Sequence, residues 1–274
     1  MYKLIVSDMD ETFLDGHHQI PPANLPALKR LRELGVLFVP SSGRGYLSIM
    51  DNFEDIDPAL MEGTYVISYN GGSINRFGDP KPIFSHNLDH DLADELWRFG
   101  RERGLSMHAY TPDGRILVQD MTENESRYLA SLRRIEKVDL PDLSSVPVVS
   151  KMIYMNMDFD WLHEFGANVI DPMLDGRATI TYSSGRYLEV NPLGCDKGEG
   201  LRKLAEILGI DIADTIAFGD SSNDREMIAA AGLGVGVANV TDDVRPVCDL
   251  VLDTTGPDGA LPELVERIVE PQHR

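Results

Sequence analysis

Three carboxylates within four residues, those of Asp8, Asp10 and Glu11, directly follow a short apolar run near the N-terminus. The run, residues 4–6, contains a β-branched pair and is typical of a buried strand. Two unit charges about 4 Å apart repel by roughly 4 kcal/mol at an effective dielectric constant near 20. A bare acidic cluster there would weaken the fold, so we expect a positive partner.

Polar residues that could complete such a site follow other predicted strands. Ser42 comes after a strand at 36–39, Asp220 comes after a strand at 215–218, and Lys197 begins the helix leading into the latter. In open α/β sheets, ligands bind outside the carboxyl ends of the strands, near the point where the strand order reverses. We therefore expect these segments to deliver carboxylates, a hydroxyl group and an ammonium group to one edge of a sheet.

The surrounding elements predict an α/β fold with a doubly wound, Rossmann-like parallel sheet. Strands and helices alternate near the N-terminus and again after residue 197, as in parallel sheets with right-handed crossovers. The predicted strands are 4–6, 36–39, 64–68, 215–218, 233–237 and 250–252, and the predicted helices are 24–34, one ending near 51, 199–208, 222–231 and 259–269.

The middle of the chain has a different pattern and predicts an inserted α+β domain. Its predicted elements are helices at 88–103 and 125–138, a strand at 151–157, and hairpins around 112–114 and 183–185. We therefore predict a core of residues 1–82 and 189–274, divided by a cap domain of residues 83–188.

Composition excludes several classes of protein. The 274 residues are 42% hydrophobic and 26% charged, which is ordinary for a globular protein, and the net charge of −20 without a basic stripe argues against nucleic acid as a partner. We find neither an apolar run of the ~18 residues needed to cross a bilayer nor an export signal. Cys195 and Cys248 are too few for a disulfide framework, so we expect a cytoplasmic protein. Oligomeric state is not predicted.

Four segments resemble, in the usual order, the motifs of the haloacid dehalogenase superfamily. They are Asp8-Met-Asp-Glu-Thr12, Ser41-Ser-Gly-Arg44, Asp196-Lys-Gly198 and Gly219-Asp-Ser-Ser-Asn-Asp224. The insertion between the second and third motifs resembles that of Cof-type phosphatases, which carry a large α/β cap. The resemblance spans nearly the whole chain and implies a Mg²⁺-dependent phosphatase.

The resemblance also implies a role for each matching residue. Mg²⁺ would bind the side chains of Asp8 and Asp220 and the backbone carbonyl of Asp10, with Asp224 as a ligand directly or through water. Lys197 would lie against the phosphoryl oxygens and Asp8. The predicted phosphate-binding residues are Ser42, Gly43, Lys197 and Asn223. The candidate substrate contacts are Arg44, Asn70, Gly71, His108 and Arg186, although Asn70 and Gly71 read equally well as a tight turn.

The chemistry expected of the paired aspartates is phosphate monoester hydrolysis. Asp8 would attack phosphorus and form an aspartyl-phosphate, while Asp10 would protonate the leaving alcohol and then activate water. The two acids must therefore lie in different environments. The expected substrates are small phosphorylated metabolites: sugar phosphates, or nucleotide or cofactor-precursor phosphates. A phosphomutase and a non-catalytic phosphometabolite-binding regulator remain alternatives.

Two positions depart from the commonest form of the family motifs. Glu11 stands where glycine usually follows the second aspartate, and its role is left open. Ser42 replaces a threonine found in many relatives and keeps the hydroxyl group.

Overall fold

The computed structural model describes residues 1–131 and 134–273. The chain forms two compact units, a core of residues 1–84 and 196–274 and an inserted unit of residues 85–195. The second boundary lies seven residues later than the 188 expected from the sequence, because the strand Tyr187–Pro192 pairs entirely within the inserted unit. Within the described residues, every helix is too short or too polar to span a bilayer.

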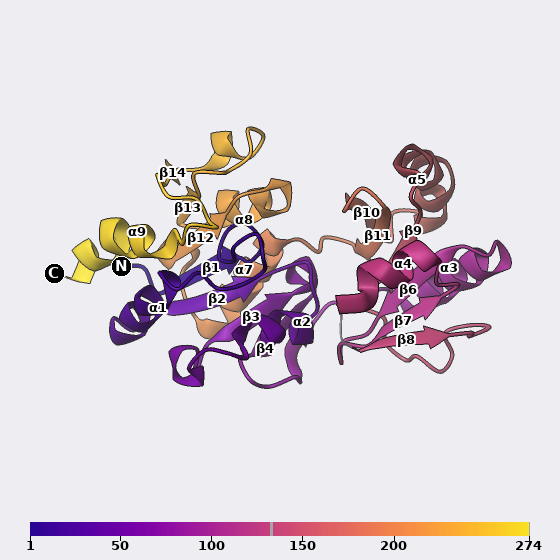
Figure 1. The fold of residues 1–274 in the computed structure, drawn as a ribbon, viewed down its shortest axis with the longest axis horizontal. Coiled ribbons are helices and arrows are strands. Elements are labelled where there is room, and N and C mark those ends of the chain that lie inside the picture. The colour runs from indigo at the N-terminus through magenta and orange to yellow at the C-terminus, as the bar shows by residue number, and fades with distance from the viewer. Residues whose placement is uncertain (132–133, 274) are drawn as a thin grey trace. The chain divides into compact units, whose positions relative to one another are not determined.

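The core is built on an eight-stranded sheet with the order β14-β13-β12-β1-β2-β3-β4-β5 (Figure 1). Neighbouring strands from β14 to β3 run parallel, and β4 is antiparallel to β3. The strands are β1 (Leu4–Asp8), β2 (Leu37–Ser41), β3 (Tyr65–Ser68), β4 (Ser73–Arg76), β5 (Pro82–Ser85), β12 (Thr215–Gly219), β13 (Leu233–Gly236) and β14 (Leu250–Val251).

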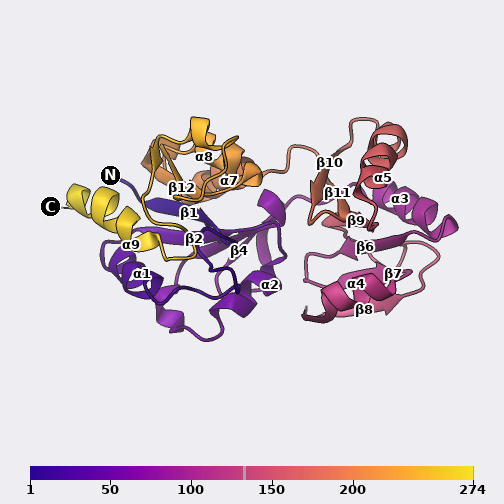
Figure 2. The same cartoon turned by 45° about the horizontal axis from the view of Figure 1, so that its top comes forward.

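Helices cover both faces of this sheet, as Figure 2 shows. They are α1 (Asn24–Glu33), α2 (Tyr46–Met50), α7 (Lys197–Leu208), α8 (Arg225–Ala230) and α9 (Leu261–Leu264). Successive residues of a strand point to opposite faces, so Ile5 packs with α1 and α9, while Leu4 and Val6 pack with α7 and α8. Burial on both faces explains the continuous apolar run of β1, and the doubly wound α/β fold is confirmed.

The inserted unit contains a six-stranded sheet with the order β10-β11-β9-β6-β7-β8. All of its neighbouring strands are antiparallel except β7 and β8. Its strands are β6 (Ser106–Tyr110), β7 (Ile116–Gln119), β8 (Ile135–Val138), β9 (Lys151–Met155), β10 (Ala178–Ser183) and β11 (Tyr187–Pro192), and its helices are α3 (His90–Glu102), α4 (Glu123–Tyr128), α5 (Phe159–Phe165) and α6 (Asp171–Leu174). Both predicted hairpins are present, as β6–β7 and β10–β11.

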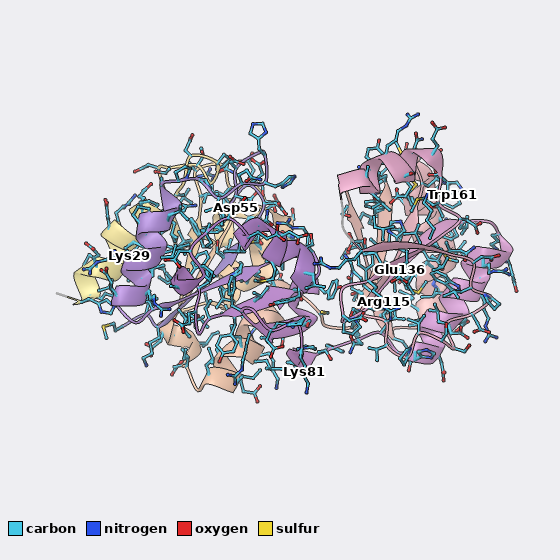
Figure 3. The ribbon with its side chains drawn as sticks, turned by 60° about the horizontal axis from the view of Figure 1, so that its bottom comes forward. Lys29, Asp55, Lys81, Arg115, Glu136 and Trp161 are labelled. Carbon is cyan, nitrogen blue, oxygen red and sulfur yellow. The ribbon has the colours of Figure 1, made fainter. Side chains whose placement is uncertain are left out.

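The predicted helix at 125–138 is wrong in its second half. Helix α4 ends at Tyr128, residues 132–133 lie outside the described part of the chain, and residues 135–138 form β8. Strand β8 pairs in parallel with β7, and the side chains of Arg115 and Glu136 at this edge lie 3.9 Å apart (Figure 3). A long-range strand pairing therefore overrides the local preference of this segment for a helix.

Candidate active site

Three buried carboxylates meet at the carboxyl edge of the core sheet. Asp8 ends β1 and Asp220 directly follows β12; the two strands are parallel neighbours, with Ser7 opposite Phe218. This register brings both aspartates to the same edge. Together with Asp224 they offer ligand oxygens that all lie within 4.8 Å of one another. The sequence-based prediction that separate strand ends converge here is therefore realised for these residues.

The Asp224 carboxylate folds back over the end of β12. Its Oδ2 accepts hydrogen bonds from the backbone N–H groups of Asp220 (3.0 Å) and Ser221 (3.1 Å), which caps the turn that begins α8. A side chain at Gly219 would prevent this, since a Cβ there would lie 2.6 Å from that of Asp224. Oδ2 of Asp224 thus stabilises the local turn, while its Oδ1 faces Lys197.

Lys197 is fully buried at the start of α7. Its Nζ donates to Asp224 Oδ1 at 2.6 Å and also to Asp8 Oδ1. The N-cap of α7 is Asp196, whose side chain accepts the N–H of Glu199 at 2.9 Å. Lys197 therefore approaches the carboxylates from a well-defined helix terminus.

The turn after β3 packs closely against the beginning of α7. Gly71 adopts φ +93°, and a Cβ at this position would lie 2.2 Å from the carbonyl oxygen of Asp196. The sequence predicts Gly71 to be a candidate substrate contact or part of a tight turn. The structure places it as a packing residue that supports the helix terminus carrying Lys197.

The buried cluster contains more acids than bases. Burial raises the pKa of the Asp8 carboxyl, and the negative charge of Asp224 raises it further. Burial likewise raises the pKa of Asp220, to about 6. The hydrogen bond that Thr12 Oγ1 donates to Asp220 at 2.7 Å lowers this pKa but does not offset the effect of burial. The carboxylates of Asp224 and Asp8 raise the pKa of Lys197 despite its burial, so the ammonium stays charged. One lysine cannot neutralise three carboxylates, and an all-oxygen donor set of this kind suits a hard divalent cation.

Asp10 lies in a different environment from Asp8. The Asp10 side chain is 40% exposed, whereas that of Asp8 is 7% exposed. Asp10 Oδ1 lies 2.9 Å from His18 Nδ1, and Oδ2 lies 3.4 Å from Arg44 Nε. The two aspartates therefore meet the requirement that a nucleophile and an acid–base group be held differently.

The end of β2 is joined to the turn after β3 by backbone hydrogen bonds. The Ser42 N–H donates to Ile67 O, and the Asn70 N–H donates to Ser42 O, both at 3.0 Å. The Ser42 hydroxyl accepts the N–H of Arg44 at 3.1 Å, and a Cβ at Gly43 would lie 3.2 Å from the Asn70 amide. Ser42, Gly43 and Asn70 therefore hold the end of β2 and the turn after β3 together at the carboxyl edge of the sheet. Arg44 instead contacts Asp10.

The remaining candidate contacts have partners within their own units. Asn223 is exposed, and its Oδ1 accepts a hydrogen bond from Ser221 Oγ at 3.1 Å. Arg186 belongs to the inserted unit, where its guanidinium lies 3.8 Å from the ring centre of Tyr128. His108 is fully buried in that unit, with Nε2 2.9 Å from Glu125 Oε1. The structure thus gives His108 a partner in the interior of the unit.

Glu11 adopts φ +59°, in the left-handed region where glycine is least strained. Its carbonyl oxygen accepts the side-chain N–H of Asn239 at 3.0 Å, and its side chain is exposed. This backbone conformation explains why glycine suits the position.

Two residues of the site, Thr12 and His18, are not predicted from the sequence. Thr12 could have been found as a hydroxyl within the first motif, but His18 carries no signal in a single sequence.

Comparisons with known proteins agree with this geometry. The model of the family described as haloacid dehalogenase-like hydrolase matches residues 5–264. The HMP-PP phosphatase of Enterobacter sp. (strain 638) is 31% identical over 241 residues, which are 87% of this chain and 85% of that protein. A haloacid dehalogenase-like hydrolase from Bacteroides thetaiotaomicron is 27% identical, with a TM-score of 0.83 over 98% of this chain and 100% of that one. TM0651 from Thermotoga maritima shares the fold, with 23% identity and a TM-score of 0.86 over 98% of each chain.

Proposed function

This chain belongs to the haloacid dehalogenase-like hydrolases and is a phosphatase of that family, and we propose that it hydrolyses small phosphate monoesters with Mg²⁺ through an aspartyl-phosphate on Asp8. The family resemblance inferred from the sequence is thereby confirmed. The observation that carries the proposed mechanism is the buried contact of Lys197 with both Asp8 and Asp224, beside Asp220. The proposed nucleophile, a buried ammonium group and the proposed metal-binding carboxylates thus lie close together.

In the first proposed step, an Asp8 oxygen attacks phosphorus and the bond from phosphorus to the leaving oxygen breaks. Asp10 gives its proton to that oxygen, so an alcohol leaves and an acyl phosphate remains on Asp8. Asp10, now ionised, then accepts a proton from water as the water attacks phosphorus. Inorganic phosphate leaves, and the Asp8 carboxylate is restored.

The Lys197 ammonium supports both steps by staying charged beside Asp8 and the expected position of the phosphoryl oxygens. The side chains of Asp8, Asp220 and Asp224 and the backbone carbonyl of Asp10 would hold Mg²⁺. When bound, the ion would neutralise charge on the transferring phosphoryl group. The excess of buried carboxylates over Lys197 supports this assignment.

The proposed substrates are small phosphorylated metabolites: sugar phosphates, or nucleotide or cofactor-precursor phosphates. The similarity to an HMP-PP phosphatase supports a small phosphate substrate, and the net charge of −20 argues against a nucleic-acid partner. We place the activity in the cytoplasm, where the thiols of Cys195 and Cys248 would stay reduced.

Turnover of p-nitrophenyl phosphate with Mg²⁺ tests the nucleophile. Asp8→Asn should keep the fold, because Lys197 remains paired with Asp224, yet lose turnover. Asp55→Asn, at an exposed aspartate of the same unit (Figure 3), is the matched control and should keep full activity. Phosphate release by Asp8→Asn at the wild-type rate would contradict the assignment. Isomerisation of a sugar phosphate without phosphate release would instead indicate a phosphomutase.

A further inference from the structure

Both oxygens of the Asp10 carboxylate contact nitrogen atoms from separate segments of the core. His18 Nδ1 lies 2.9 Å from Oδ1, and Arg44 Nε lies 3.4 Å from Oδ2. The Asp10 side chain is 40% exposed, so surrounding atoms alone do not fix its orientation. These two contacts therefore set the direction in which the carboxyl group points.

The backbone holds His18 in place even though its ring is largely exposed. Asp15 Oδ1 accepts the N–H groups of His17 (2.8 Å) and Gln19 (2.9 Å), which closes the loop around His18. The His18 carbonyl accepts the side-chain N–H of Asn52 at 2.7 Å, and His18 itself adopts φ +58°. A non-glycine residue in this region costs about 1 kcal/mol or more and persists where its surroundings impose it. The loop therefore presents the ring in a defined position.

We propose that His18 is a positioning residue that orients Asp10 for proton transfer to the leaving group. The inference rests on the proposed function, in which Asp10 protonates the leaving oxygen. Proton transfer by a placed side chain contributes about 10²–10⁴-fold to rate, and efficient transfer requires heavy atoms within roughly 3 Å. Without the ring, one oxygen of Asp10 loses its support while Arg44 continues to attract the other, so the carboxyl group turns away from the leaving oxygen.

If His18 positions Asp10 in this way, the loss of activity on replacing His18 should depend on how much the leaving group needs a proton. p-Nitrophenolate is a good leaving group and needs little protonation, whereas the alkoxide of glycerol 2-phosphate needs a proton. In His18→Ala, kcat/KM for glycerol 2-phosphate should fall about tenfold, while kcat/KM for p-nitrophenyl phosphate should stay within about threefold, as a partial loss of the general-acid contribution implies. His18→Asn carries an amide nitrogen near the place of Nδ1 and should recover most of the loss.

The adjacent histidine offers a matched control. His17 is exposed and joins the loop through its backbone N–H, so His17→Ala should leave both substrates unchanged. Far-UV circular dichroism and thermal unfolding check that each variant is folded. An equal loss on both substrates in His18→Ala, or no difference from His17→Ala, would overturn the positioning role while the proposed function stands. Inactivity of the wild-type enzyme toward both esters with Mg²⁺ would overturn both together.

Discussion

Lys197 Nζ lies 2.6 Å from Asp224 Oδ1, with both side chains fully excluded from solvent, and the same ammonium contacts Asp8. The contact joins the first turn of α7 to the capped turn after β12. A charge pair in such a place is costly to separate, because either partner alone would be left in the interior without a counter-charge.

Replacing Lys197 should therefore destabilise the core. Lys197→Met leaves three buried carboxylates without their lysine, and we expect the free energy of unfolding in Mg²⁺-free buffer to fall by about 3–5 kcal/mol. Lys203→Met, on the same helix, removes a partly exposed lysine paired with Glu206 and should change stability by less than about 1 kcal/mol. Urea unfolding measures both, and equal effects would contradict the buried-pair account.

Magnesium should stabilise the folded protein if, as proposed, it binds the assembled carboxylates and not the unfolded chain. At a Mg²⁺ concentration of 100 times Kd, the expected gain is about 2.7 kcal/mol, and chelation should reverse it. Asp220→Asn should abolish most of the rise in Tm. Asp242→Asn, at an exposed acid of the same unit, should retain it. An unchanged Mg²⁺ response in Asp220→Asn would exclude Asp220 as a ligand.

Gly71→Ala should disturb the support of Lys197. The left-handed backbone and the 2.2 Å approach to Asp196 O together predict a loss of about 3 kcal/mol and a lower kcat. Gly78→Ala is the control: its φ is +84°, but no atom lies within 4 Å of the added Cβ. It should cost about 1 kcal/mol and leave kcat unchanged. Similar effects of the two variants on kcat would show that the packing of Gly71 does not position the site.

The stability of the core should contain an acid-labile contribution from Glu263 on α9. Partial burial raises its pKa, but hydrogen bonds from Thr254, Asp253 N–H and Arg267 outweigh this and lower it to about 2 from 4.5. A lowered pKa in the folded state stabilises the protein above pH 4.5, and the contribution is lost as pH falls toward 2.

Glu263→Gln should therefore lower the free energy of unfolding at pH 7 by about 2 kcal/mol, since hydrogen bonds to a charged group are lost. The difference from wild type should shrink as pH falls below 4.5. Glu266→Gln, exposed on the next turn, is the control and should show no such trend. Denaturant unfolding across this pH range measures the difference in unfolding free energy between Glu263→Gln and wild type. A difference that grows toward low pH would contradict the proposed contribution of Glu263.

Much of the core could be predicted because its strands are buried on both faces. The apolar run of β1 and the alternation of strands with amphipathic helices are local patterns, and they predict the correct fold class, although β1 and β2 each extend two residues beyond their predicted ends. Strand β8 could not be found in this way. Its apolar residues, Ile135 and Val138, are spaced by three as on a helix, and only the distant partner β7 makes the segment a strand.

Some residues of the candidate site could likewise be predicted from the sequence, and others could not. Asp8, Asp220 and Lys197 lie at the ends of predictable elements, so their convergence follows from the topology of the sheet. The roles of Gly71 and His18 depend on a left-handed backbone and on contacts between distant segments, which a single sequence does not display. The sequence likewise does not show why Glu11 stands in the first motif. The structure shows that this position has a left-handed backbone, with φ +59°, while the Glu11 side chain is exposed.

The contact between Asp8 and Lys197 joins residues 189 positions apart, with the entire inserted unit encoded between them. On a ribosome that adds about 5–20 residues per second, Asp8 is made roughly 10–40 seconds before Lys197. During that interval, β1 also lacks β12, one of its two neighbours in the sheet. The nascent chain therefore carries Asp8 without the lysine and the two aspartates that lie beside it in the folded core, and this buried cluster can form only once the second half of the core has been synthesised.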